Sequence, residues 1–151
     1  MPIATSSERI NLFSENKTKE LANKISLNLK INDIVFLYGE MGVGKTTFIK
    51  YLINIFQKQN KLELTEVTSP TFNILNEYEI NKVNINHYDL FRLKSPEELK
   101  DFNLFEKKLN EISLIEWPEI IDKKPKNLIK LFFKYEDDHL NRSVQIKGLD
   151  L

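Results

Sequence analysis

The segment LYGEMGVGKTTF, residues 37–48, is the most informative part of this chain for its fold. It follows the spacing G-x-x-x-x-G-K-[ST] of a phosphate-binding P-loop, with the fixed positions taken by Gly39, Gly44, Lys45 and Thr46. Glycines let the backbone turn tightly, so that its N–H groups can approach a polyphosphate. The motif therefore predicts phosphate binding, although a P-loop can serve a kinase, a motor, a switch or a simple binder.

The residues on either side of the loop support this prediction. Residues 34–38, IVFLY, form an apolar run that is typical of a buried strand. In residues 45–57, apolar side chains recur at the spacing of a helix. The positive end of that helix would face the phosphates, so we expect Lys45 to contact them and Thr46 to bind Mg²⁺. The predicted nucleotide-binding loop consists of Gly39, Glu40, Met41, Gly42, Val43, Gly44, Lys45, Thr46 and Thr47.

Composition narrows the class of protein. A chain of 151 residues suits one domain, predicted to span residues 1–151. The formal net charge is zero, which does not fit an autonomous nucleic-acid binder. The absence of cysteine excludes disulfides and a cysteine nucleophile, and two distant histidines disfavour a zinc site. Without a signal-peptide pattern or a membrane-length apolar run, the chain is expected to be cytoplasmic and to have no membrane contact.

Strand and helix patterns alternate around the P-loop. Residues 71–90 resemble a hairpin around Asn81, whose second strand alternates apolar and polar residues and should be half-buried, with His87 an ordinary strand residue. We expect a three-layer α/β P-loop NTPase fold, with a mostly parallel central sheet plus an antiparallel hairpin. The other predicted elements are strands over residues 8–13, 34–38, 112–117, 127–135 and 142–148, and helices over 16–30, 45–57 and 95–109.

Two acids are candidates for the metal and the attacking water. Asp89, in HYDLFR, and Glu116, in LIEWPE, each lie where a predicted strand ends. Ligands of open α/β sheets gather at the carboxyl ends of the strands, so either acid could serve Mg²⁺ or orient the water. The structural alternative is that Asp89 caps the next turn and that Glu116 is an exposed acid.

Thr71, in the segment TSPTF, is a further candidate. A threonine in a loop of this kind can bind Mg²⁺ once the terminal phosphate is present, although from the residues alone an ordinary turn before a strand is the better explanation. Trp117 could stack on a base or belong to the core. Only three arginines occur, at positions 9, 92 and 142, which disfavours a nucleoside monophosphate kinase. Because the chain contains no N-K-x-D motif, ATP is favoured over GTP.

The ordered set of motifs GEMGVGKTTF, SPTFNILNEY, HYDLFRL, PEEL and LIEWPE resembles the TsaE (YjeE) family. The similarity runs from about Thr18 to Glu119, with a weaker match around Arg142. Members of this family are small bacterial P-loop ATPases of the pathway that makes threonylcarbamoyladenosine (t6A) at adenosine 37 of tRNA. Two departures are Glu40, where Asp is common, and Asn103, where Gly is usual.

The resemblance implies both partners and residue roles. TsaE proteins act on a complex of TsaD and TsaB, while TsaC supplies threonylcarbamoyl-adenylate, and tRNA contact is expected to be indirect. Thr71, Asp89, Glu116 and Trp117 match family motif positions, with Thr71 in a switch-like loop and the acids implicated in metal binding or water activation. The expected site therefore has Glu116, Asp89 and Thr71 as catalytic residues and Thr46, Glu116 and Asp89 as Mg²⁺ ligands. Trp117 and Arg142 are expected to contact the nucleotide.

Two functions of different class remain open at this point. The first is an Mg²⁺-dependent ATPase that is weak without its partners. The second is a nucleotide-dependent binding module, in which ATP orders the loop around Thr71 and hydrolysis is incidental. A small-molecule kinase is a third reading.

Overall fold

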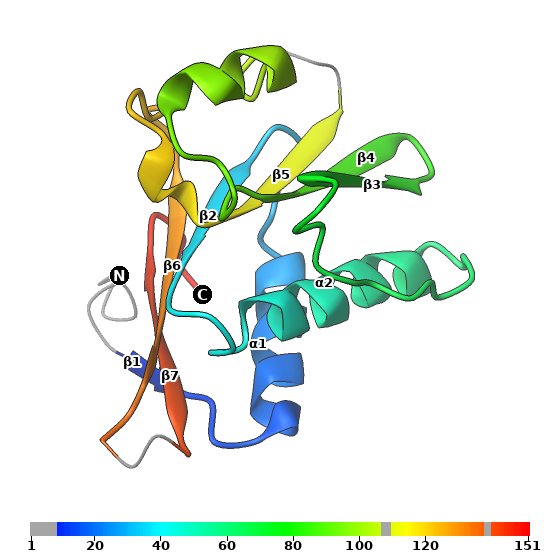
Figure 1. The fold of residues 1–151 in the computed structure, drawn as a ribbon. Helices are drawn as coiled ribbons and strands as arrows, with labels where there is room; N and C mark the ends of the chain where they lie inside the picture. The colour runs from blue at the N-terminus through cyan, green and yellow to red at the C-terminus, as the bar shows by residue number, and fades with distance from the viewer. Residues whose placement is uncertain (1–8, 107–109, 138–139) are drawn as a thin grey trace.

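A computed structural model describes residues 9–106, 110–137 and 140–151 of the chain. Within these ranges seven strands form one sheet, in the order β1-β7-β6-β2-β5-β4-β3 (Figure 1). The strands are β1 (Arg9–Asn11), β2 (Ile34–Tyr38), β3 (Leu75–Ile80), β4 (Val83–Asp89), β5 (Glu111–Glu116), β6 (Ile129–Tyr135) and β7 (Arg142–Lys147). The strands β4, β5, β2 and β6 are mutually parallel, whereas β3 pairs with β4 as an antiparallel hairpin. The predicted fold class is confirmed.

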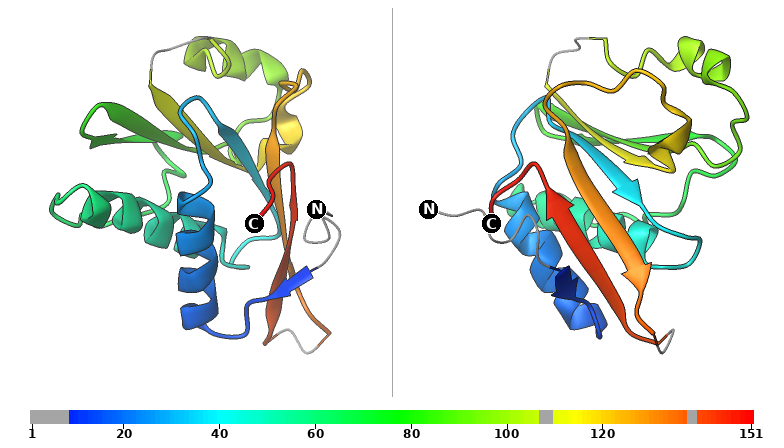
Figure 2. Two further views of the ribbon diagram at one scale, coloured as in Figure 1. Left: turned by 180° about the vertical axis from the view of Figure 1, so that it is seen from behind. Right: turned by 90° about the vertical axis from the view of Figure 1, so that its left-hand side faces the viewer.

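Helices cover both faces of the sheet and make three layers (Figures 1 and 2). On one face lie α1 (Glu15–Ser26) and α2 (Lys45–Gln59), and on the other lie the short 3₁₀ helices η2 (Pro96–Phe102) and η3 (Pro118–Ile120). Successive residues of β2 serve opposite layers, because Val35 and Leu37 join the core under the α-helices while Phe36 joins the second core. A strand buried on both faces explains the continuous apolar run.

The first helix is specified by local sequence signals. Ser14 precedes it in an extended conformation, and its Oγ accepts a hydrogen bond from the Lys17 N–H at 3.3 Å. Leu21, Ala22 and Ile25 are buried in the core, but the helix ends at Ser26, four residues before the predicted end, so Leu29 lies outside it. None of the helices in the described part of the chain is both long and apolar enough to cross a membrane.

The predicted helix after Ser95 is wrong in type and length. The Glu98 carboxylate accepts hydrogen bonds from the backbone N–H groups of Lys94 and Ser95, at 2.6 and 3.1 Å, which lowers its pKa. The start signal is therefore real. However, the helix is a seven-residue 3₁₀ helix that ends where Asn103 adopts φ 50°. None of its residues is fully buried, and Leu99 and Phe102 pack only in part against the second core, which is a narrow apolar contact for a longer helix. Residues 107–109 lie outside the described residues.

The prediction that the second hairpin strand is half-buried is also wrong. In β4, Asn86 and Tyr88 are 1% and 2% exposed, on the face opposite to His87. The second core covers this face, where the Tyr88 ring meets Phe102 of η2 edge-on. Residue types alternate along β4 although both of its faces are buried, because Asn86 is a polar residue at a buried position. Its side chain hydrogen-bonds Glu111 and Asn84.

The ionisation of Tyr88 tests whether this second face is buried. Burial raises the pKa of its phenol to about 12, helped by the charges of Glu111 and Glu77. A raised pKa in the folded state means that stability is lost as the pH rises from about 10, the ordinary tyrosine pKa, through the folded value. We expect the ultraviolet absorbance difference between wild type and Tyr88→Phe to titrate near the raised value. A difference that titrates like an ordinary tyrosine would show that β4 has one open face.

Candidate functional site

The P-loop connects the end of β2 to the start of α2, and its backbone shape depends on glycine. Gly39 has φ 143°, and a Cβ there would lie 2.8 Å from the Phe133 carbonyl oxygen and 2.9 Å from a Val43 methyl group. Gly44 has φ 115° and immediately precedes the first residue of α2. Val43 itself is 1% exposed, so its side chain anchors the loop in the core. A larger residue at Gly39 would displace the loop.

The N-terminus of α2 is suited to an anion. Gly44 caps the helix without a side chain, and the first turn contains no acidic residue. Its leading N–H groups therefore lack a side-chain acceptor, and the helix dipole adds positive potential at the same end. Lys45 opens the helix and is 3% exposed.

The Lys45 ammonium lies close to one aromatic side chain and to several acidic groups. Its Nζ donates a hydrogen bond to the Gly39 carbonyl and lies 3.8 Å from the centre of the Trp117 ring. Burial lowers the pKa of Lys45, and the charges of Glu116, Glu119 and Asp89 oppose that change. Trp117 reaches this place from an αL backbone conformation, φ 56°, between β5 and η3. Lys45 is thus partly desolvated and has a weak acceptor that a phosphate oxygen can replace.

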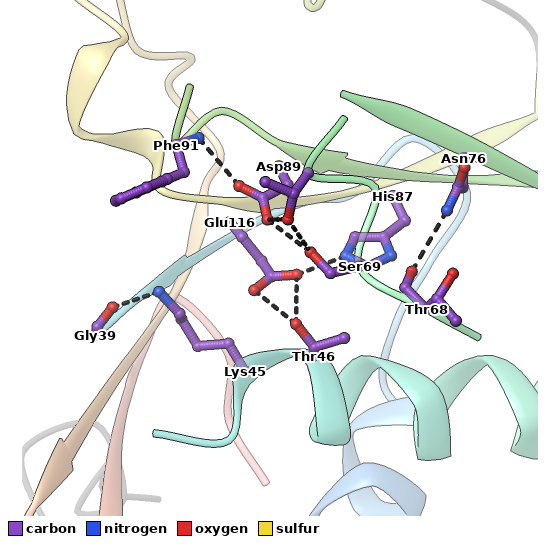
Figure 3. A network of polar contacts seen from close by, with 11 residues as sticks. Gly39, Lys45, Thr46, Thr68, Ser69, Asn76, His87, Asp89, Phe91 and Glu116 are labelled. Carbon is purple, nitrogen blue, oxygen red and sulfur yellow. Dashed lines mark hydrogen bonds and ion pairs between the residues drawn. The ribbon is translucent and has the colours of Figure 1, made fainter. Parts of the chain in front are cut away.

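Strand register brings the two acids together. Glu116 pairs with Leu37 of β2 on one side and with Asp89 of β4 on the other, so all three lie in one row at the carboxyl ends of the parallel strands. Glu116 is 2% exposed, which excludes the alternative of a surface acid. Its two carboxylate oxygens each accept from the Thr46 hydroxyl at 3.1 Å, and Oε2 lies 2.6 Å from His87 Nε2 (Figure 3).

Asp89 is bonded to two loops at once. Its Oδ1 accepts from the Phe91 backbone N–H at 3.0 Å, so it does cap the following turn. Its Oδ2 accepts from the Ser69 hydroxyl at 2.8 Å and from the Thr71 hydroxyl at 3.2 Å (Figure 3). The cap and the site role are therefore compatible, because different oxygens serve them.

A cavity of about 260 Å³ joins these groups. This is slightly below the roughly 300 Å³ at which small-molecule pockets begin, so it suits the phosphate end of a nucleotide better than a whole one. Its lining residues are Met41, Gly42, Gly44, Lys45, Thr46, Thr47, Ser69, Thr71, Asp89, Phe91, Glu116 and Trp117.

Four residues that were expected in the site do not line this cavity. Glu40 is exposed, and the Val43 side chain faces the core. Gly39 lies beneath Lys45 and accepts its hydrogen bond. Arg142 lies behind the loop, with Nη1 3.6 Å from the place that a Cβ on Gly44 would occupy.

The residues present fit Mg²⁺ bound together with phosphate. The described ranges hold no group of three or more His, Asp and Glu side chains that could bind a metal unaided. Mg²⁺ commonly keeps waters and binds through one or two carboxylates plus substrate phosphates. The Thr46 hydroxyl beside the Glu116 carboxylate, at the N-terminus of α2, is a set of that kind.

Sequence reasoning missed two residues of this site. His87 was expected to be an ordinary strand residue, yet its buried ring contacts Glu116. Ser69 was quoted only as part of a turn, yet it binds Asp89. A signal for His87 was available, because period two places it on the same face of the strand as Asp89.

Comparisons with known proteins give a family for this geometry. A family model described as "Threonylcarbamoyl adenosine biosynthesis protein TsaE" matches residues 12–144. A tRNA threonylcarbamoyladenosine biosynthesis protein TsaE of Rickettsia conorii is 49% identical over 73% of this chain and 61% of its own length. Proteins of the same name from Rickettsia bellii and Aquifex aeolicus are 44% and 37% identical, over 84% and 74% of this chain and 86% and 77% of their own lengths. The chain spans about three fifths of the R. conorii relative.

A solved structure supports the fold. Bacillus subtilis YdiB superposes with a TM-score of 0.68 over 92% of this chain and 83% of its own, at 23% identity. Identity at that level carries the fold alone.

Removal of the Asp89 carboxylate should release the loop over residues 69–72. Hydrogen bonds to a charged group contribute about 1.5–3 kcal/mol each, and Asp89→Ala removes those to both hydroxyls. We expect amide hydrogen exchange in this loop to accelerate by about tenfold or more, while the core of the sheet remains protected. Asp101→Ala, at an exposed position of η2, is the control. Unchanged exchange at residues 69–72 would show that other contacts hold the loop.

Proposed function

Because the chain belongs to the TsaE family, we propose that it is an Mg²⁺-dependent ATPase that supports t6A formation at adenosine 37 of tRNA. One observation carries the proposal: Lys45, Thr46 and Glu116 converge at the N-terminus of α2, in one cavity with Asp89. This combination supplies a phosphate cradle, a metal ligand and a buried carboxylate within one P-loop site.

Binding of ATP would use the loop and the first turn of α2. The backbone N–H groups and the helix dipole attract the phosphates. Lys45 exchanges the Gly39 carbonyl for a phosphate oxygen, and because its charge is partly desolvated, that contact is strong. Thr46 provides its hydroxyl to Mg²⁺, which neutralises charge on the transferred phosphoryl group when bound.

The two acids differ in their surroundings, and this divides their roles. Glu116 is bonded to Thr46 and therefore serves the metal and its waters. Asp89 is bonded to Ser69 and Thr71 and therefore holds the switch-like loop against the phosphate end of the cavity. Thr71 lies in the loop that Asp89 holds, and we assign to its hydroxyl the response to the terminal phosphate.

The enzyme alone should be slow, since none of the described residues that line the cavity is an arginine. The guanidinium of Arg92 stacks on Phe72 at 5.2 Å, and Arg142 lies over Tyr135 behind the P-loop. An arginine that faces the transferred phosphoryl group commonly contributes a large part of the rate in P-loop enzymes. We infer that a complex of TsaD and TsaB completes the site. TsaC acts in the same pathway, and tRNA contact runs through the complex.

A nucleotide-dependent binding module is the second candidate function, and one observation favours it. Phe72, next to Thr71, is 83% exposed and stacks only on Arg92 among the contacts described. If ATP orders this loop, the pair would form an apolar and cationic docking surface whose assembly matters more than hydrolysis.

Two substitutions separate the candidates. Lys45→Ala should abolish ATP binding, whereas Glu116→Ala should keep binding and lower turnover by roughly 100-fold, as loss of one preorganised charged group commonly does. Glu79→Ala, at an exposed acid of β3, is the control. The measurement is phosphate release from Mg²⁺·ATP, for the protein alone and with purified TsaB–TsaD.

The response to the partners decides the assignment. A low basal rate that rises with TsaB–TsaD and is lost in Glu116→Ala is the expected result. Partner binding and t6A formation that survive Glu116→Ala would instead favour the binding module. No response to the partners would contradict the role in t6A formation.

A further inference from the structure

His87 occupies the centre of the polar cluster that the P-loop and the strand ends enclose. Its side chain is fully buried, and Nε2 lies 2.6 Å from Glu116 Oε2. The other ring nitrogen, Nδ1, is also buried and finds no hydrogen-bond partner among the described residues. A buried histidine with one short contact and one unpartnered nitrogen is unusual, since buried polar atoms are nearly always paired.

We propose that His87 is a positioning residue: its imidazole donates from Nε2 to Glu116 and fixes the orientation of that carboxylate toward Thr46 and the nucleotide. The proposal rests on the proposed function for the role of Glu116. His87 itself touches neither nucleotide nor metal in this arrangement; it acts through Glu116.

The pattern of partners assigns the proton to Nε2. A carboxylate only accepts hydrogen bonds, so the nitrogen that faces Glu116 carries hydrogen. Nε2 is therefore the donor of the 2.6 Å contact with Glu116.

Glu116 needs such a partner because its last torsion is soft. The carboxylate of a glutamate rotates in a broad, roughly two-fold well, and the Thr46 hydroxyl lies 3.1 Å from both oxygens and does not distinguish them. The contact with His87 commits Oε2 and leaves Oε1, which accepts only from Thr46, as the oxygen on the cavity side. One hydrogen bond thus converts a rotating carboxylate into an oriented one.

The sheet sets the position of the imidazole. His87 pairs with Leu114 in register, two residues before the row in which Asp89 pairs with Glu116. Both His87 and Asp89 point to the α2 side of the sheet (Figure 3). The strand β4 therefore supplies one group that holds the loop over residues 69–71 and another that holds Glu116.

Three substitutions of His87 separate positioning from packing. His87→Gln places an amide donor as many bonds from Cα as Nε2, His87→Asn places it too short, and His87→Leu removes it. Loss of a group that orients a ligand typically costs 10–100-fold, so His87→Leu and His87→Asn should lower kcat by about tenfold or more. We expect His87→Gln to stay within about threefold of wild type, and the Kd for ATP without Mg²⁺ to change little in all three, because the P-loop sets it.

Asn86→Leu is the matched control. Asn86 is 1% exposed in the same strand but on the opposite face, where it hydrogen-bonds Glu111. Its replacement should lower the melting temperature without changing kcat. If kcat instead falls with melting temperature across His87→Gln, His87→Leu and Asn86→Leu alike, the role of His87 is structural and the proposal is wrong.

Two measurements do not depend on turnover. In the ¹⁵N NMR spectrum of the nucleotide-free protein, the His87 ring, identified by its absence in His87→Gln, should carry hydrogen on Nε2, the nitrogen that faces Glu116. The factor by which Mg²⁺ tightens ATP binding should fall in His87→Leu and persist in His87→Gln. An Nε2 without hydrogen, or an unchanged Mg²⁺ factor in His87→Leu, would overturn the proposal. A wild-type protein that hydrolyses no ATP, even with TsaB–TsaD, would contradict the proposed function, and these two results would still decide the assignment of His87.

Discussion

The parallel pairing of β2, β5 and β4 is the constraint on which the site depends. It places Leu37, Glu116 and Asp89 in one row, at the end of the sheet where the P-loop leaves β2. Backbone hydrogen bonds of the ladder fix that row, and buried side chains on both faces of the sheet hold the ladder. The acids therefore reach the start of α2 without any flexible segment between them. A shift of one residue in the register of β5 would turn Glu116 to the opposite layer.

Three charged side chains of the site lie together at positions with little solvent exposure. Lys45, Glu116 and Asp89 are each less than 5% exposed, and buried charges are tolerated only where partners compensate for lost hydration. Every one of them has such partners: Gly39 and Trp117 for Lys45, Thr46 and His87 for Glu116, and two hydroxyls with a backbone N–H for Asp89. Low local polarity also strengthens any interaction with a phosphate, so the same burial that is costly for folding serves binding.

Sequence reasoning predicted what local chemistry determines and failed where the surroundings decide. The P-loop, the strand before it and the helix after it are encoded in consecutive residues, and the acids were found because each lies at the end of a predicted strand. The two faces of β4 could not be assigned, because polar residues at Asn84 and Asn86 look solvated until the layer around η2 is known to cover them. The start of η2 was predicted from Ser95 and Glu98, but its end was not, because Asn103 takes an αL conformation there and Leu104 packs on the second core outside the helix. Val43 was assigned to the ligand by its place in the motif, yet its side chain belongs to the core.

The site combines a rigid side with an adaptable one. Glu116, His87 and Asp89 project from strands whose neighbours are fixed, whereas Met41 and Phe72 are 65% and 83% exposed at the mouth. Trp117 lies between the two sides: its αL conformation, a costly one for a bulky residue, brings the ring over Lys45 and against Phe91. The Phe91 N–H donates to Asp89, so Trp117 contacts both Lys45 and the turn that Asp89 caps. The Asp89 carboxylate also holds the Ser69 and Thr71 hydroxyls, so the phosphate end of the cavity and the exposed loop share a chain of direct contacts.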